Sequence, residues 1–190
     1  MGSNDQQIAQ SQLAYQQAEK GPRVLFFSGG TALTTLSHAL VNYTHNSIHI
    51  ISAFDSGGSS AALRCYFDMP AVGDIRSRLI ALSDTTRPEC VAARDLLTYR
   101  LSYIGSDSLL LSELQQIAYG EHALLANVDI KVKALICSAL TDFLIKLPGD
   151  FQLRGASIGN LVLAGRYLQN DKPLNEIISE FGQWLGALGS

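Results

Sequence analysis

The chain has few cysteines, no long apolar run and no excess of positive charge, and each absence excludes a class of protein. Its three cysteines, Cys65, Cys90 and Cys137, are odd in number and lack metal-ligand spacing, so we expect reduced thiols. No window holds about 18 consecutive apolar residues or a signal-peptide pattern, so we expect no membrane span, no export and a cytoplasmic location. A net charge of −3 gives no case for nucleic-acid binding.

Several standard site signatures are also missing. The sequence has no Gly-Lys-Ser/Thr loop of the Walker A type, no G-x-G-x-x-G, and no helical histidine pair of a zinc site. What it does have is the composition of a globular protein, 47% hydrophobic and 16% charged over 190 residues. We predict a polar N-terminal tail over 1–22 and one α/β domain over 23–190, with a helical subdomain at about 88–148.

The first informative segment is a glycine turn between a strand and a helix. Residues 23–27 are apolar and bounded by turn formers, which predicts a buried strand. Leucines at helical spacing after the turn predict a helix that begins near Thr31. Gly29 and Gly30 allow a close backbone approach, and the helix end offers free N–H groups to a phosphate. The alternative is an ordinary tight turn.

The same pattern recurs at residues 48–64. A strand over 48–54 runs into Asp55-Ser56-Gly57-Gly58-Ser59-Ser60 and then into a helix. Parallel strands place both turns at one edge of the sheet, where open α/β sheets bind ligands. Asp55 is suited to hold Mg²⁺ or to orient a hydroxyl, and Ser59 and Ser60 are suited to donate to phosphate oxygens. Alternatively, these side chains only cap the next helix.

A third segment, residues 69–79, combines a helix start with two arginines. Asp74 is predicted as the N-cap of a short helix. Arg76 and Arg78 lie near its start, where guanidinium groups could bind a diphosphate in a bidentate manner. The competing interpretation is two solvated arginines on a helix surface.

A fourth segment, residues 154–161, is a loop of small residues that leads into an apolar run. Gly155 and Gly159 permit close approach, and the Asn160 amide could read a base or a ribose. A tightly packed helix start would explain the same pattern. Around these segments, apolar periodicity predicts helices from Pro88, over 132–147 up to Pro148-Gly149, and from about 171–173 onward.

Together the four segments resemble the 2-phospho-L-lactate transferase (CofD) family, which includes the YvcK-type proteins. The resemblance covers roughly residues 23 to 188 and is closest to the bacterial CofD-related branch. The matching motifs are Phe26-Phe27-Ser28-Gly29-Gly30-Thr31, Thr44-His45-Asn46-Ser47-Ile48-His49, Phe54 to Ser60 with Leu63-Arg64, Met69-Pro70 with Gly73-Asp74-Ile75-Arg76, and Gly159-Asn160-Leu161.

The resemblance implies an α/β fold, a Rossmann-like three-layer core with a mostly parallel sheet and a helical subdomain. It implies Mg²⁺-dependent transfer of 2-phospholactate from a guanosine diphosphate conjugate to a deazaflavin, a step in coenzyme F420 synthesis. The alternative within the family is a non-catalytic regulator of YvcK type that binds UDP-sugars. Carried over by motif, Asp55 is the catalytic and metal residue, and the ligand-binding residues are Ser28, Gly29, Gly30, Thr31, Ser56, Gly57, Gly58, Ser59, Ser60, Arg64, Asp74, Arg76, Gly159 and Asn160.

The sequence departs from the family pattern in three respects. Ala32 stands where many members have a third glycine, and Ser56 stands where many have a second aspartate. A single carboxylate should weaken Mg²⁺ binding, which affects transfer more than nucleotide binding. The chain is also shorter than typical members. An incomplete sheet would leave an unpaired edge and apolar surface, so we expect a homodimer with weak or no transferase turnover.

Overall fold

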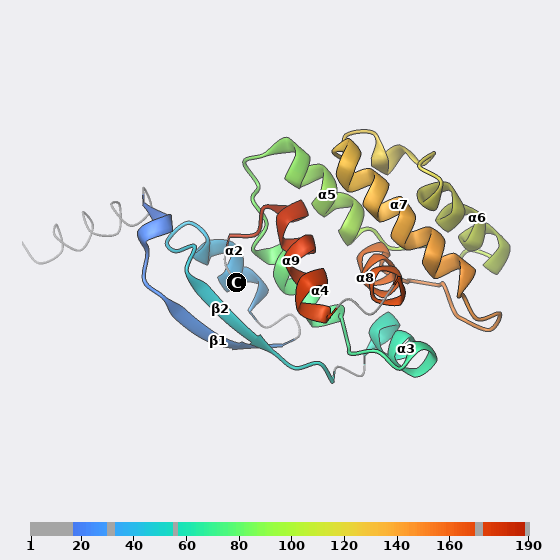
Figure 1. Cartoon of the computed structure of the whole chain (residues 1–190), viewed down its shortest axis with the longest axis horizontal. Helices are drawn as coiled ribbons and strands as arrows, with labels where there is room; N and C mark the ends of the chain where they lie inside the picture. The colour runs from blue at the N-terminus through green and yellow to red at the C-terminus, as the bar shows by residue number, and fades with distance from the viewer. Residues whose placement is uncertain (1–16, 30–32, 55–56, 170–172, 189–190) are drawn as a thin grey trace, which may run out of the picture.

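The computed structural model describes residues 17–29, 33–54, 57–169 and 173–188 (Figure 1). Two short 3-10 helices, η1 and η2, accompany two strands and eight α-helices in this part of the chain. In chain order the elements are η1 (Ala18–Lys20), β1 (Val24–Ser28), α2 (Thr34–Leu40), β2 (Ser47–Ile51), α3 (Gly58–Phe67), α4 (Gly73–Ala81), α5 (Pro88–Thr98), α6 (Asp107–Ala118), η2 (Ala123–Leu125), α7 (Ile130–Ile145), α8 (Ile158–Leu168) and α9 (Leu174–Leu185).

Strands β1 and β2 pair in parallel, in register from Val24 opposite Ser47 to Ser28 opposite Ile51. The strands predicted at 23–27 and 48–54 are therefore confirmed with shifted ends, but the predicted burial of the first strand is wrong, because alternate residues of β1 are exposed. The α/β class with a parallel sheet is also confirmed. Among the described residues the sheet has these two strands, and helices α2, α4 and α9 lie on one side of it (Figure 1).

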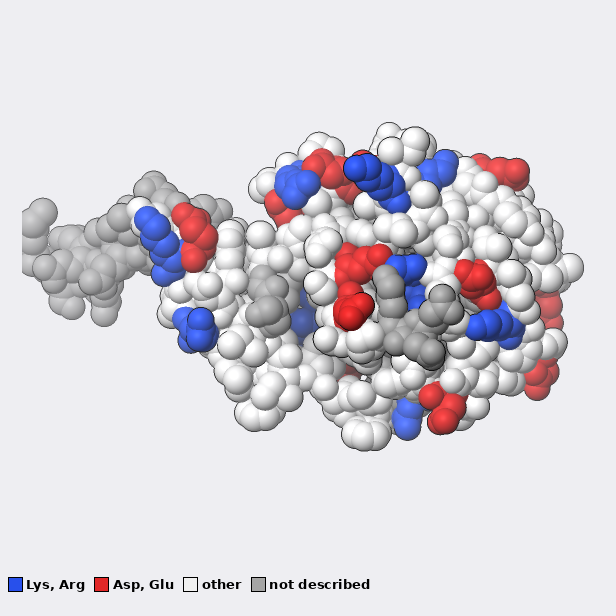
Figure 2. Space-filling model, viewed as in Figure 1, with Lys and Arg blue, Asp and Glu red and all other residues white. Residues whose placement is uncertain are grey.

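The two faces of this sheet differ sharply. Toward the helices, the Phe26 ring stacks on His49 at a centroid distance of 5.2 Å. On the opposite face Leu25, Phe27 and Ile50 are 51%, 80% and 48% exposed. Figure 2 shows little charge over the strands, whereas Lys, Arg, Asp and Glu are spread across the helical part. Because parallel sheets are normally covered on both faces, this bare apolar face requires an explanation.

The helical part has one continuous core, to which α3 to α9 all contribute. Helix α8 lies at its centre, since every residue from Ile158 to Arg166 is buried. The predicted helices at Pro88, over 132–147 and after 171–173 are confirmed as α5, α7 and α9. The boundaries predicted for a subdomain at 88–148 stay a prediction. None of the described helices combines the length and hydropathy that a membrane crossing requires.

Candidate functional site

A pocket of about 220 Å³ lies where the N-terminal ends of α3, α4 and α8 meet. These helices follow the second, third and fourth segments identified in the sequence, and Figure 1 places them near one another. The described residues that line the pocket are Gly57, Gly58, Ser59, Ser60, Gly73, Asp74, Arg76, Ser77, Arg100 and Asn160. The fold thus gathers three segments that are far apart in the chain.

Ser60 fixes the junction of α3 and α4. Its buried Oγ accepts hydrogen bonds from the backbone N–H groups of Val72 at 3.2 Å and Gly73 at 3.1 Å. This hydroxyl therefore does the capping predicted for Asp74, and that prediction was wrong: α4 begins at Gly73 with Val72 as its N-cap. Asp74 lies in the first turn instead, where a carboxylate interacts favourably with the helix dipole.

Asn160 ties the start of α8 to α3. Its Nδ2 donates to Ser59 Oγ at 2.9 Å, across 101 residues of sequence. Its Oδ1 is buried without a hydrogen-bond partner among the described residues. Buried polar atoms are rarely left unpaired, and those that are often mark a functional position. The amide thus retains an unused acceptor beside the pocket.

Arg76 is held inside the pocket rather than on a solvated surface. Its side chain is 9% exposed, its Nη1 donates to Ser157 Oγ, and its Nη2 donates to Ser77 Oγ at 3.2 Å. Its Nε has no partner among the described residues. None of the ion pairs of the described residues includes Arg76. A buried cation without an acidic partner suits a site that receives an anion.

The absence of a side chain at Gly159 leaves the space in which the Arg76 side chain lies. A Cβ on this residue would lie 2.4 Å from the carbonyl oxygen of Leu97 and 2.7 Å from Arg76 Cδ. Any larger side chain would displace either α5 or the arginine. The sequence attributed to Gly159 a close approach to a ligand, whereas the structure shows a close approach to Arg76.

Arg100 is a second cation at the pocket, on the exposed segment after α5. Its Nη1 donates to the Gly155 carbonyl at 2.9 Å, and its backbone forms an antiparallel bridge with Ser157. Burial, and then the nearby charge of Arg100, lower the pKa of Arg76 to about 10. Arg76 is therefore still cationic at neutral pH, and the neighbouring charge of Arg100 repels it. An anion between them would relieve that repulsion.

The first glycine loop approaches the same place from the sheet. A Cβ on Gly29 would lie 3.6 Å from Asp74 Oδ2, so this loop adjoins the carboxylate of the pocket. Ser28 is buried and its Oγ contacts His49 Nδ1 at 2.8 Å, away from the pocket lining. Gly30, Thr31, Asp55 and Ser56 lie outside the described residues, so their predicted roles stay predictions.

The remaining arginines of these segments have other contacts. Arg78 was predicted to reach a diphosphate or to be solvated, but it lies on the opposite side of α4 from Arg76, buried against α2. Its Nη1 donates to the Leu33 carbonyl at 3.1 Å and to Ser37 Oγ. Two residues of spacing turn a helix by about 200°, which explains the separation. Arg64, in the last turn of α3, donates to the Phe54 carbonyl at 3.2 Å and does not line the pocket.

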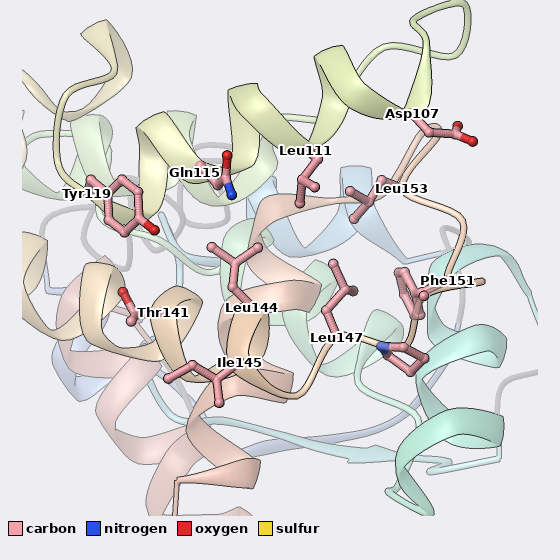
Figure 3. Close-up of a pocket in the computed structure, with 12 residues that line it drawn as sticks. Asp107, Leu111, Gln115, Tyr119, Thr141, Leu144, Ile145, Leu147, Phe151 and Leu153 are labelled. Carbon is pink, nitrogen blue, oxygen red and sulfur yellow. The ribbon is translucent and has the colours of Figure 1, made fainter.

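A larger hollow of about 490 Å³ lies between α6 and α7 (Figure 3). Its wall includes Leu111 of α6, Leu144 of α7 and Phe151 from the segment after α7, while Tyr119 and Asp107 lie toward its two ends. Its described lining includes one carboxylate and no basic side chain. This hollow is larger than the pocket at the ends of α3, α4 and α8, but its lining does not suit a phosphate.

The family model described as 2-phospho-L-lactate transferase CofD matches residues 24–189. The chain belongs to this family. The match spans all the segments that build the pocket, so the pocket is a feature of the CofD-family part of the chain.

Individual CofD-family relatives agree with this assignment. An uncharacterized protein of Saccharomyces cerevisiae is 32% identical over 76% of this chain and 33% of its own length. The gluconeogenesis factor of Listeria monocytogenes is 34% identical over 52% of this chain and 31% of its own length. A crystal structure of a UPF0052 family member from Bacillus halodurans covers 90% of this chain and 38% of that chain, at 26% identity and a TM-score of 0.55. The chain thus spans only about a third of these relatives.

Sequence reasoning missed Arg100, Ser77 and Ser157 as members of the site or its support. Ser77 follows Arg76 directly in a segment already singled out, so its position was available as a signal. Ser157 also lies in such a segment, residues 154–161. Arg100 reaches it through an isolated bridge between residues 57 apart, which no periodic pattern in the sequence predicts.

Proposed function

We propose that this CofD-family chain binds a nucleoside diphosphate conjugate, with the diphosphate in the pocket between α3, α4 and α8. The observation that carries the proposal is the pairing of Arg76 and Arg100 across one small pocket. Guanidinium groups bind phosphate oxygens in a bidentate manner, which makes arginine the usual partner of a phosphate.

The ends of the helices add to this preference for an anion. The N-terminal turn of an α-helix carries a partial positive charge and points N–H groups outward. Three such ends border the pocket. The helix that begins at Gly58 has no side chain over its first backbone unit, whereas the N–H of Gly73 at the start of α4 already donates to Ser60 Oγ. Gly58 also has a positive φ of 53°, which glycine adopts at little cost. A pocket of about 220 Å³ suits the phosphates, with the nucleoside and the conjugate extending from it.

The oxygen atoms around the pocket are compatible with a nucleoside diphosphate that binds together with Mg²⁺. Protein-bound Mg²⁺ usually has one or two carboxylates, substrate phosphate oxygens and several waters. Asp74 is the carboxylate that the described lining supplies, and Asp55 stays the carboxylate predicted from sequence. When bound, Mg²⁺ would neutralise phosphate charge. Arg76, Arg100 and Asn160 would orient the diphosphate, whether or not transfer follows.

Two functions share this binding step. The family description favours transfer of a phosphorus-containing group, such as 2-phospholactate to a deazaflavin. The relatives named gluconeogenesis factor favour the YvcK-type alternative. For that alternative, the sequence resemblance implies a regulator that binds a nucleotide sugar without turnover. Calorimetry of the full chain with GDP, UDP and UDP-sugars, with and without Mg²⁺, identifies the ligand. An assay with guanosine diphosphate-linked lactate and a deazaflavin then separates the two, because only a transferase releases GMP.

Replacing Arg100 by glutamine should weaken binding of the preferred nucleoside diphosphate roughly tenfold, because one charged hydrogen-bonding group is lost. Arg154→Gln is the matched control. Arg154 lies near the same loop, but its partners are the Gly105 carbonyl and Asp107, outside the pocket. Calorimetry at two salt concentrations measures both variants. Equal affinities for the two variants would place the phosphate elsewhere.

We also propose that two copies of the chain associate through the bare face of the β1–β2 sheet. Leu25, Phe27 and Ile50 form an uncharged face, and an identical face on a second copy can pack against it with twofold symmetry. Sedimentation at micromolar concentration should give a dimer. Phe27→Lys should give a monomer, whereas Ile104→Lys, at a 96% exposed position away from the sheet, should leave the dimer intact. A monomeric wild-type chain would contradict this proposal.

A further inference from the structure

Another cavity, of about 280 Å³, lies on the covered side of the sheet, between β2, α4 and α9. Its wall is mainly apolar, with Ile51 from the sheet, Ile75 and Leu79 from α4, and Leu174 and Ile178 from α9. Ligand pockets are typically roughly 300–1,000 Å³ with mostly apolar walls and a few polar groups. The cavity therefore has the wall of a site for a small ligand, and its volume lies just below that range.

The polar group of this cavity is Arg78. Its side chain is 4% exposed, and its Nε has no hydrogen-bond partner among the described residues. Its hydrogen-bond partners, the Leu33 carbonyl and Ser37 Oγ, are both neutral. Burial lowers the pKa of Arg78 while the charge of Asp74 raises it, and no ion pair of the described residues includes it. A buried guanidinium without a carboxylate in contact is costly, and an anion in the cavity would offset that cost.

His49 supports the same interpretation from the sheet side. Its ring lines the cavity, with Nδ1 at 2.8 Å from Ser28 Oγ and Nε2 at 3.2 Å from Ser47 Oγ. Burial, and then the charge of Arg78, lower the pKa of His49 to about 4. The imidazole is therefore neutral at neutral pH, and the positive charge at the cavity belongs to Arg78. Asp74, the nearby acid, lines the other pocket.

We infer that this cavity binds a small monocarboxylate with an apolar chain or ring, its carboxylate on Arg78 and its apolar part against α4 and α9. The site is separate from the phosphate pocket, because Arg76 and Arg78 leave α4 on opposite sides. The apolar wall selects against the highly charged phosphates of a nucleotide. The unpaired arginine selects against neutral and cationic ligands of the same shape.

Octanoate, octan-1-ol and octylamine test the inference on the full chain by calorimetry. Octanoate should bind at least tenfold more tightly than octanol, and octylamine should not bind. Arg78→Gln should remove the preference of octanoate over octanol. The NMR titration of His49 should shift to higher pH with octanoate present, because a nearby carboxylate favours the imidazolium form.

Ala53→Leu places extra volume in the cavity wall and should abolish octanoate binding, with Ala39→Leu on the exposed side of α2 as the control. Arg100→Gln should leave octanoate binding unchanged, which separates this site from the phosphate pocket. Equal affinity for octanoate and octanol, an unshifted His49 titration, or binding that survives Ala53→Leu in a folded variant would each overturn the inference. Failure of nucleotide binding would not affect it.

Discussion

Replacing Asn160 by aspartate is expected to abolish binding of the nucleoside diphosphate, with a loss of at least about 100-fold, or about 2.8 kcal/mol. The two side chains have nearly the same shape, so Ser59 Oγ can still hydrogen-bond to position 160. The change places a negative charge in the pocket that contains Arg76 and Arg100. That carboxylate would neutralise the arginines internally and repel the phosphates.

Calorimetry and thermal unfolding of the variant provide the measurement. Because the new carboxylate lies near two cations, the melting temperature should stay close to that of the wild type while affinity disappears. Asn175→Asp adds the same charge at an exposed position on α9 and should change neither quantity. Retained affinity in Asn160→Asp would show that the phosphates do not occupy this pocket.

Gly165→Ala should be the most damaging change to the fold, with a loss of about 3 kcal/mol in the free energy of unfolding. Helices α7 and α8 are so close that a Cβ at this position would lie 1.9 Å from the Ala139 carbonyl oxygen. A backbone carbonyl cannot rotate away as a flexible side chain can. The two helices would have to separate at the centre of the core, where α8 is buried on all sides.

Gly182→Ala is the matched control, since this glycine also lies within a helix. A Cβ there would meet Ala187 and Leu79 at 3.8 Å and 3.9 Å, which are ordinary contacts. Alanine has the higher helix propensity, so stability should hold or rise by up to about 1 kcal/mol. Chemical denaturation of both variants gives the comparison. Equal stabilities would mean that α7 and α8 adjust freely, contrary to their packing.

The sequence predicted elements well where a periodic pattern decided them. The strands β1 and β2, the helices α2 and α3 that come next after them in the chain, and the apolar stripe of α7 follow from side-chain alternation and helical spacing. The α/β class follows from that order. These are local properties, and tertiary packing in this chain reinforces them.

Predictions from local sequence patterns failed where a contact with a residue far away in the chain determines the structure. Ser60 accepts hydrogen bonds from the N-terminal N–H groups of α4, although it lies 12 to 13 residues earlier. Asp74 is therefore not the N-cap, even though aspartate is a common N-cap residue. Arg76 and Arg78 looked equivalent in sequence, yet one faces Ser157 and the other faces Ser37. Arg100 joined the site only through a bridge to Ser157. No single-sequence signal encodes these long-range pairings.

The bond between Asn160 and Ser59 has a consequence for how the protein folds. The pocket between α3, α4 and α8 has no local precursor, because Ser59 and Asn160, which join two of its walls, are 101 residues apart. Contacts of such sequence separation form late, after the entropy of closing long loops has been offset by packing. A chain that has folded only in part would therefore have no affinity for the ligand. A bound nucleotide would stabilise only the completely folded chain, by about 2.7 kcal/mol at a hundredfold excess over Kd. Nucleotide binding would therefore measure the fraction of chains that are fully folded.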